Sequence, residues 1–255
     1  MISAIIQARE DSSRLPNKVL KDINGKPMLQ RVLDRCRESK VGSQIIVCTD
    51  SEEIKKSVID WGYIVKLTSK NCNSGSQRIA SVINELVLQS WGLNQKRVEE
   101  GLLGEILENT LVINVQGDMP FIKDNHINVL KERLLKFQMS TLACPFVNLN
   151  EANNSSKVKV LIDENNCALD FSRTLNDKQK VNKNIFHHIG IYGYHKDFLS
   201  NFISLSPTQR ELSEKLEQLR VIETDKIGIS IIKEEILGVD TQEDLDRVNR
   251  LIYKK

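Results

Sequence analysis

The sequence is poor in the features that mark secreted and membrane-bound proteins. It has only five cysteines among 255 residues, and they form neither a CxxC pair nor a dense disulfide pattern. No stretch approaches the roughly 18 to 20 apolar residues that span a bilayer. The first residues carry neither a basic leader nor a small-residue cleavage site. We therefore expect reduced thiols, a cytoplasmic location and no membrane partner.

The chain also lacks an excess of charge of either sign. It has 36 Lys and Arg against 34 Asp and Glu, a formal net charge of +2. This balance supplies no continuous basic face, and no strand combines aromatic with basic residues in the way that RNA-binding sheets do. Nucleic acid is therefore not an expected partner, and any phosphate ligand must be held by a local cluster of cations.

The first half of the chain alternates short apolar runs with helical patterns. A hydrophobic content of 40% over this length can form the core of one α/β domain. Strands are predicted at 2–7, 44–48, 63–67 and 110–115, and helices at 27–40, 51–61 and 74–88. The polar stretch 89–109 is interpreted as a connection. This order predicts a parallel sheet covered by helices, with 110–115 at its centre.

The second half follows a different pattern. After a predicted helix at 124–137, closely spaced strands are predicted at 140–147, 157–162, 168–172 and 187–194. We interpret them as an antiparallel or mixed subregion, at about 140–195, inserted into a single domain that covers 1–255. Helices at 196–203 and 209–219, a strand at 227–232 and a helix at 241–252 complete the chain. Thr241 and Asp244 resemble a capping box at the start of that last helix.

Three cations lie in the loop after the first predicted strand: Arg9, Arg14 and Lys18. Open α/β sheets bind ligands at the carboxyl ends of their strands. Arginine offers a planar fork to phosphate oxygens, and lysine a compact charge. This loop therefore suits a triphosphate, although a solvated surface loop with incidental charges is the alternative. The pattern GxxxxGK[ST] is absent, which excludes a Walker-type loop.

A second cluster is predicted around two acidic residues. Asp118 follows the strand 110–115 after Gly117, which lets the backbone pass close to a ligand. Magnesium prefers one or two carboxylates together with phosphate oxygens and water, so a second carboxylate is expected. Asp240, just before the last helix, is the candidate, and a helix-capping role is its alternative.

Residues 8–20, with the sequence AREDSSRLPNKVL, resemble the signature loop of sugar-acid cytidylyltransferases, and of these most closely the 3-deoxy-manno-octulosonate (KDO) cytidylyltransferases. Seven further segments resemble that family in order: SGSQR at 74–78, NVQGD at 114–118, KVKV at 157–160, FSR at 171–173, HIGIYGY at 188–194, EQLR at 217–220 and GVDT at 238–241. The triplet QAR at 7–9 is also similar to a branch associated with spore-coat polysaccharide synthesis.

The resemblance implies a fold and an activity. The fold is a three-layer α/β/α nucleotide-diphospho-sugar transferase architecture with a mixed, mostly parallel sheet. The activity is transfer of CMP from CTP to a 2-keto sugar acid, with release of pyrophosphate, for lipopolysaccharide or other surface polysaccharide. A magnesium ion held by Asp118 and Asp240 is implied, and the inserted subregion is expected to form a homodimer.

The resemblance also implies the residues of the site. The catalytic set is Lys18, Arg9, Arg14, Asp118 and Asp240. Arg9 and Lys18 bind the nucleotide together with Ala8, Ser12, Ser74, Gly75, Arg78 and Gln116. The sugar acid is bound by Arg173, His188, Tyr192, Glu217 and Gln218. Core packing is the alternative for His188 and Tyr192.

Several positions depart from the family pattern. Gln7 stands where the KDO enzymes generally have Pro, Ser76 and Gln77 replace Thr and an acidic residue, and Met119 replaces an acidic residue. The polar segment 174–184 takes the place of Ala-x-Ile-Pro. The sugar is therefore left open among KDO, an analogue such as 8-amino-KDO, and a sialic-acid-like sugar. A catalytically idle nucleotide- or sugar-binding homologue is the remaining alternative.

Overall fold

The structure is a computed structural model that describes residues 2–9, 14–39, 44–72, 74–83, 85, 110–175 and 184–253. These residues form two compact units. The first contains Met1–Ile127 and Ile236–Lys255, and the second contains Asn128–Glu235. The predicted insertion at about 140–195 lies within the second unit, which begins earlier and ends later than predicted. The predicted connection at 89–109 lies outside the described residues.

The first unit is built on four parallel strands in the order β6, β1, β4, β5. Their bounds are Ile2–Ala8 for β1, Gln44–Thr49 for β4, Ile64–Leu67 for β5 and Leu111–Gln116 for β6. The central strands are apolar and buried, as expected where helices cover a parallel sheet. In the parallel register Gln7 lies opposite Gln116 and Ala8 opposite Thr49. The carboxyl ends of β1 and β6 therefore meet at one edge.

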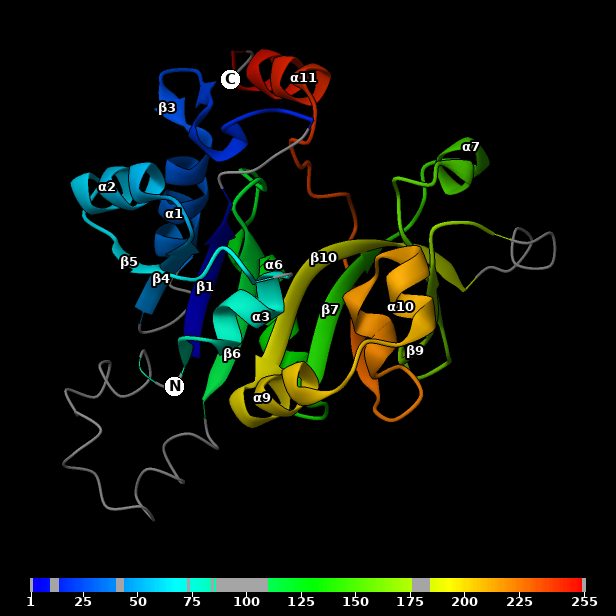
Figure 1. Cartoon of the computed structure of the whole chain (residues 1–255). Coiled ribbons are helices and arrows are strands. Elements are labelled where there is room, and N and C mark those ends of the chain that lie inside the picture. The colour runs from blue at the N-terminus through cyan, green and yellow to red at the C-terminus, as the bar shows by residue number, and fades with distance from the viewer. Residues whose placement is uncertain are drawn as a thin grey trace. The chain divides into compact units, whose positions relative to one another are not determined.

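Among the described residues, four α-helices belong wholly to this unit: α1 (Met28–Glu38), α2 (Glu52–Asp60), α3 (Gly75–Ala80) and α11 (Gln242–Tyr253). α1 buries the apolar face that the sequence predicts, and α2 is capped by the Ser51 hydroxyl, which accepts from Ile54 N. α3 lies against β1, β4 and β6 (Figure 1). α3 ends at Ala80, where the chain makes a turn, and residues 83 and 85 are helical again. The rest of the helix predicted at 74–88 lies outside the described residues.

The segment between β1 and α1 is tied to the C-terminal helix. It contains a short 3-10 helix, η1 (Lys18–Leu20), and a hairpin of β2 (Asp22–Ile23) and β3 (Lys26–Pro27). Leu15 and Ile23 pack in one apolar cluster with Leu245 and Val248 of α11. The Asn24 backbone N–H donates to Asn249 Oδ1 at 3.0 Å. These contacts fix the position of the loop that carries Lys18.

The second unit is a mixed sheet with short helices around it. Its strands are β7 (Met139–Cys144), β8 (Lys159–Ile162), β9 (Ala168–Ser172), β10 (Ile185–His195) and β11 (Ile227–Ile231). β10 is antiparallel to β7 and β8, β8 is antiparallel to β9, and β11 is parallel to β7. The predicted antiparallel subregion is thus confirmed. α6 (Asp124–Leu134) leads from the first unit into the second.

In the described part of the second unit the helices are α7 (Leu149–Asn153), α9 (Lys196–Ser204), α10 (Gln209–Glu214) and the 3-10 helix η2 (Glu217–Arg220). The single helix predicted at 209–219 is wrong. α10 ends at Glu214 because Lys215 adopts a left-handed conformation with φ of 53°, and the chain restarts as η2. The break places Glu217 and Gln218 on a separate turn.

All five cysteines are buried and none forms a disulfide. Within the described part of the chain, no helix has both the length and the apolar character needed to cross a membrane.

Candidate active site

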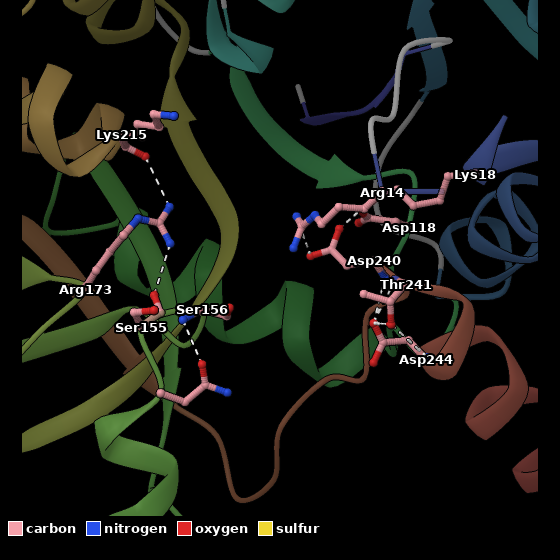
Figure 2. Close-up of polar contacts among 11 residues, drawn as sticks. Arg14, Lys18, Asp118, Ser155, Ser156, Arg173, Lys215, Asp240, Thr241 and Asp244 are labelled. Atoms are coloured by element: carbon pink, nitrogen blue, oxygen red, sulfur yellow. Dashed lines mark hydrogen bonds and ion pairs between the residues drawn. The ribbon is translucent and has the colours of Figure 1, made fainter. Parts of the chain in front are cut away.

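Lys18 lies between two carboxylates at the carboxyl edge of the first unit's sheet. Its Nζ donates to Asp118 Oδ2 at 2.6 Å and to Asp240 Oδ1 at 2.8 Å (Figure 2). Arg14 Nη2 lies 3.2 Å from the other oxygen of Asp240. The Lys18 side chain is only 13% exposed, whereas the side chain of Asp240 is 50% exposed. Lys18 thus contacts both predicted acidic residues, and Arg14 contacts Asp240.

The backbone around Asp118 is held by hydrogen bonds from two directions. Gly117 N donates to Gln7 O at 3.1 Å, and a Cβ at Gly117 would lie 2.9 Å from that oxygen. Only glycine therefore fits at this approach of β6 to β1. Val239 N donates to Asp118 O at 3.0 Å, which brings the segment before α11 beside Asp118.

The predicted capping box orients Asp240. Asp244 Oδ2 accepts from Asp240 N at 3.1 Å, from Thr241 N at 2.9 Å and from Thr241 Oγ1 at 2.8 Å (Figure 2). Asp244 N donates back to Thr241 Oγ1 at 3.2 Å. The capping function that was the alternative for Asp240 is performed by Thr241 and Asp244. The Asp240 carboxylate is directed to Lys18 and Arg14 instead.

Electrostatics keep this cluster charged. Burial alone would lower the pKa of Lys18, but Asp118 and Asp240 together raise it above its ordinary value. Burial would raise the pKa of Asp240, but the hydrogen bond from Lys18 and the charges of Lys18 and Arg14 lower it. At neutral pH the cluster is therefore an ammonium held between carboxylates.

The two carboxylates have the chemistry of a magnesium site. They are hard oxygen donors that converge on one positive charge, the Lys18 ammonium, and magnesium is commonly held by one or two carboxylates. No group of three or more His, Cys, Asp or Glu able to hold a metal occurs among the described residues. A divalent cation at Asp118 and Asp240 would thus complete its shell with water or substrate oxygens.

Four other residues predicted to bind the nucleotide lie at the end of β1 and at the start of α3. Ala8 ends β1 and is buried, and Arg9 beside it is half-buried. The Ser74 hydroxyl accepts from Gln77 N at 3.1 Å at the start of α3. Gly75 is buried there. Ser12 lies outside the described residues.

Arg78 is fully buried and bonded to protein groups. Its Nη2 donates to Asp50 Oδ2 at 2.6 Å, and its Nη1 donates to the Thr68 hydroxyl. These bonds direct the guanidinium toward the loops after β4 and β5. The contact of Arg78 with a nucleotide stays a prediction.

Gln7 is a residue of this site that sequence reasoning noted only as a departure from the family. Its Nε2 donates to Gln116 Oε1 at 2.6 Å. In the parallel pair of β1 and β6, Gln7 and Gln116 are direct register partners, so their side chains lie on the same face of the sheet. This register is the signal from which the pair could have been identified.

In the second unit, three of the residues predicted to bind the sugar form a polar group, in which His188 and Gln218 are buried and Tyr192 is half-buried. Tyr192 OH donates to Gln218 Oε1 at 3.1 Å, and the ring of His188 lies 5.5 Å from that of Tyr192. Gln218 Nε2 is buried without a hydrogen-bond partner among the described residues. Burial, with the charge of Glu217, raises the pKa of Tyr192. Gln218 thus carries an unsatisfied amide group, as expected where a ligand supplies the missing acceptor.

The hydrogen bonds of the Thr141 hydroxyl determine which nitrogen of His188 carries the ring proton. The Thr141 hydroxyl donates to Ile191 O at 2.8 Å, and it lies 3.0 Å from His188 Nε2. One hydroxyl has one hydrogen, so toward His188 this oxygen acts as an acceptor and Nε2 carries the ring proton. Burial is the main cause that lowers the pKa of His188 to about 3. The ring is therefore neutral, with Nδ1 as its acceptor.

Arg173 is held by backbone carbonyls. Nε donates to Glu214 O at 2.7 Å, Nη1 to Ser155 O at 3.3 Å and Nη2 to Lys215 O at 3.5 Å (Figure 2 shows the last two). The guanidinium thus joins the segment before β8 to the end of α10, and it supports the break between α10 and η2.

A cavity among the described residues is separate from the carboxylates. It has a volume of about 570 Å³ and is lined by α1 and the turn after Asp118, with Phe121 and Ile122 among its apolar residues. Its acidic side chains Asp34 and Glu38 are already paired with cations.

A family model described as cytidylyltransferase matches residues 3–231. The chain is 37% identical over 265 residues to the 3-deoxy-manno-octulosonate cytidylyltransferase of Actinobacillus pleuropneumoniae serotype 7, and the match covers 98% of each chain. It is 36% identical to the enzyme of that name from Haemophilus influenzae Rd, again with 98% of each chain covered.

Solved structures agree with this match. The chain is similar to CMP:2-keto-3-deoxy-manno-octonic acid synthetase complexed with CTP, with a TM-score of 0.84, 29% identity, and 99% and 98% of the two chains covered. A cytidylyltransferase from Leptospira borgpetersenii shares the fold, with a TM-score of 0.61, 16% identity, and 100% and 87% of the two chains covered. The predicted α/β nucleotide-diphospho-sugar transferase fold is confirmed. Because the family match and the KDO-enzyme similarity both extend over almost the whole length, the chain belongs to the cytidylyltransferase family.

Proposed function

We propose that the chain transfers CMP from CTP to the anomeric hydroxyl of KDO or a close analogue, releasing pyrophosphate, in the synthesis of lipopolysaccharide or a related surface polysaccharide. The observation that carries this proposal is the Lys18 ammonium between Asp118 and Asp240. It lies in a chain 37% identical to a KDO cytidylyltransferase over nearly its full length.

In this proposal the first unit binds CTP. Arg9, Arg14 and Lys18 contact the phosphates. The cytosine and ribose are bound by the remaining predicted residues: Ala8, Ser12, Ser74, Gly75, Arg78 and Gln116. The solved relative at 29% identity holds CTP, which supports the choice of nucleotide.

Asp118 and Asp240 would hold a magnesium ion in the proposed enzyme. When bound, magnesium neutralises negative charge on the α-phosphate and on the leaving pyrophosphate. These residues fit a magnesium ion because the two carboxylates converge on one cation, the Lys18 ammonium. In this account Lys18 occupies the cation position of the ligand-free cluster and turns to the phosphates when the nucleotide is bound.

The chain's own groups then position the reactants. The C2 hydroxyl oxygen of the sugar forms a bond to the α-phosphorus, the bond from that phosphorus to the bridging oxygen breaks, and pyrophosphate leaves with the electron pair. The hydroxyl proton passes to water. Lys18 and Arg14 stabilise the charge that builds on the phosphates, because positioning and charge neutralisation supply most of the acceleration in phosphoryl transfer.

The second unit would bind the sugar acid through Arg173, His188, Tyr192, Glu217 and Gln218. A sugar hydroxyl would satisfy Gln218 Nε2, the buried donor without a partner. Neutral His188 would accept a hydrogen bond from a sugar hydroxyl at Nδ1. The backbone bonds of Arg173 indicate that it contributes by shaping the η2 segment as well as by its charge.

We further propose that the enzyme is a cytoplasmic homodimer. Support comes from the second unit, where Leu169 on β9 and Ile231 on β11 are 55% and 42% exposed. Light scattering of the purified chain tests this. A mass twice that of the chain is expected, and a monomer at micromolar concentration would contradict it.

The activity is tested by pyrophosphate release with Mg²⁺ and CTP across KDO, 8-amino-KDO and sialic acids. Turnover with KDO or 8-amino-KDO is expected. Turnover with only a sialic acid would replace the sugar in the proposal, and CTP binding without turnover on any of these acids would favour an idle homologue.

A further inference from the structure

We propose that Arg220 is a positioning residue that, paired with Glu211, holds the turn η2 in place and thereby sets the affinity for the sugar acid through Gln218. The inference deepens the proposed function and rests on it for the identity of the ligand. It begins from the side chain of Gln218, which is buried and whose Nε2 has no hydrogen-bond partner among the described residues. Such a donor is costly to bury unless a ligand supplies the acceptor.

The turn that carries Gln218 has little structure of its own. η2 is a 3-10 helix of four residues, and short 3-10 helices have few and poorly aligned internal hydrogen bonds. The chain reaches it from α10 through Lys215, whose φ of 53° is left-handed, and Leu216. The position of Gln218 is therefore fixed mainly by side-chain contacts that η2 makes with its surroundings.

The ion pair between Arg220 and Glu211 is the strongest of these contacts. Arg220 Nε donates to Glu211 Oε2 at 2.9 Å, and Nη2 donates to Oε1 at 2.5 Å. Only 10% of the Arg220 side chain and 9% of the Glu211 side chain are exposed. A two-point pair of this kind fixes direction as well as distance. It joins the first turn of α10 to the last residue of η2, so it closes the segment 211–220 that carries Gln218.

Arg220 also connects η2 to a row of aromatic rings. Its Nη1 donates to two carbonyl oxygens at the end of α9, and its guanidinium lies over the Phe202 ring, 5.0 Å from the centroid. The Phe202 ring stacks on Tyr194 at 6.3 Å, and Tyr194 stacks on Tyr192 at 5.9 Å. Tyr192 OH donates to Gln218 Oε1. The row thus runs from Arg220 at one end to the partner of Gln218 at the other.

Two attachments therefore orient the Gln218 amide. Tyr192 holds its oxygen, while Arg220 and Glu211 hold the backbone from which the side chain extends. With the oxygen held, Nε2 is the end that remains for a ligand, and an oxygen of a sugar acid is a suitable acceptor. If the ion pair were lost, η2 could shift and the amide would lose this orientation. The loss should appear in the affinity for the sugar acid and not in that for CTP, which is proposed to bind the first unit.

The test measures the affinity for KDO and 8-amino-KDO by calorimetry, with CTP present and divalent cations chelated so that no transfer occurs. Glu211→Gln combined with Arg220→Gln leaves no buried charge without a partner. This double variant should raise the Kd of the sugar acid about tenfold and leave the Kd of CTP unchanged. Arg220→Lys keeps the charge but loses the planar fork, so a smaller rise of about threefold is expected.

Arg133→Met is the matched control. Arg133 also donates to a backbone carbonyl, that of Ile229, and lies over a phenylalanine ring, that of Phe137, within the second unit. Its replacement should leave the affinities for the sugar acid and for CTP unchanged. Circular dichroism and thermal unfolding verify that each variant is folded.

Two further readouts separate positioning from a general loss of stability. Hydrogen exchange of peptides that cover 215–221, measured without any ligand, should be faster in the double variant and unchanged in Arg133→Met. Gln218→Met alone should raise the Kd of the sugar acid. Adding the double variant to Gln218→Met should raise it by less than about twofold more, because the pair acts through Gln218.

Wild-type affinity for the sugar acid in the double variant would overturn the inference, as would an equal loss of affinity for CTP. A fully additive effect with Gln218→Met, or no binding of either acid by the wild-type chain, would overturn it as well. Because the readout needs no transfer, a chain that binds a sugar acid but releases no pyrophosphate would reject the proposed reaction while the effect of Arg220 is still measured.

Discussion

The ammonium of Lys18 lies 2.6 Å from a carboxylate oxygen of Asp118, a residue one hundred positions later in the chain. Together with the 2.8 Å contact to Asp240, this makes Lys18 the counterion of the two carboxylates that are proposed to hold magnesium. A magnesium ion at the proposed site would therefore compete with Lys18 for the same oxygens in the absence of nucleotide.

Lys18→Met is expected to raise the affinity of the nucleotide-free chain for Mg²⁺, because the internal competitor is removed. Calorimetric titration with MgCl₂ measures it, with Lys21→Met on the same segment as control. The same variant should lose on the order of a hundredfold in turnover, as when one donor to a developing charge is lost. Unchanged or weaker Mg²⁺ binding would contradict the competition, and near-normal turnover would contradict the catalytic role.

Asp244→Ala is expected to weaken both the fold and the proposed metal site. The carboxylate accepts three hydrogen bonds from Asp240 and Thr241, so its loss removes one half of the capping box of α11 and frees the Asp240 backbone. Stability should fall by about 1 kcal/mol, and half-saturation by Mg²⁺ should require a higher concentration. Asp246→Ala on the exposed side of α11 is the control. A variant with lowered stability but unchanged Mg²⁺ dependence would show that the cap does not position Asp240.

The positions of Lys18, Asp118 and Asp240 could be predicted from the sequence because each residue follows a predicted strand or precedes a predicted helix. Carboxyl ends of parallel strands meet at one sheet edge, and Thr241 with Asp244 marks the start of the last helix. These local signals required no knowledge of side-chain packing.

The orientation of Arg78 and Arg173 could not be anticipated in the same way. Both guanidiniums are directed by partners remote in sequence, Asp50 for Arg78 and the carbonyls of 155, 214 and 215 for Arg173. The break at Lys215 was missed for a related reason, because the pattern of 209–219 fits one helix and only tertiary contacts select the left-handed turn.

His188 should make stability depend on pH. Its pKa is lowered from about 6.5 in an unfolded chain to about 3 in the folded one, mainly by burial. The unfolded chain therefore binds a proton between these values that the folded chain does not. This contribution to stability is complete above pH 6.5 and falls as the pH drops toward 3.

At pH 5 the expected loss is about 2 kcal/mol relative to pH 8. Urea unfolding at the two pH values measures it. His188→Gln retains a donor to Thr141 but cannot be protonated, so the difference should shrink by that amount. An equal pH dependence in the variant would rule out His188 as its source.

Tyr192→Phe is expected to affect the sugar and not the nucleotide. It removes the hydrogen bond to Gln218, so the Gln218 amide loses its orientation. A loss of about 1 kcal/mol corresponds to a roughly fivefold rise in KM for the sugar acid, with KM for CTP unchanged. Tyr63→Phe, which loses a hydrogen bond to Asp34 in the first unit, is the control. A rise in KM for CTP alone would contradict the assignment of Tyr192 to the sugar.

If Lys18, Asp118 and Asp240 form the catalytic centre of a CMP-transferring enzyme, the purified chain releases pyrophosphate from CTP and KDO in Mg²⁺. We expect this turnover to stop on chelation of the metal and to fall at least a hundredfold in both Asp118→Asn and Asp240→Asn, with Asp246→Asn unaffected. Full turnover in either carboxylate variant, or turnover independent of divalent cation, would contradict it.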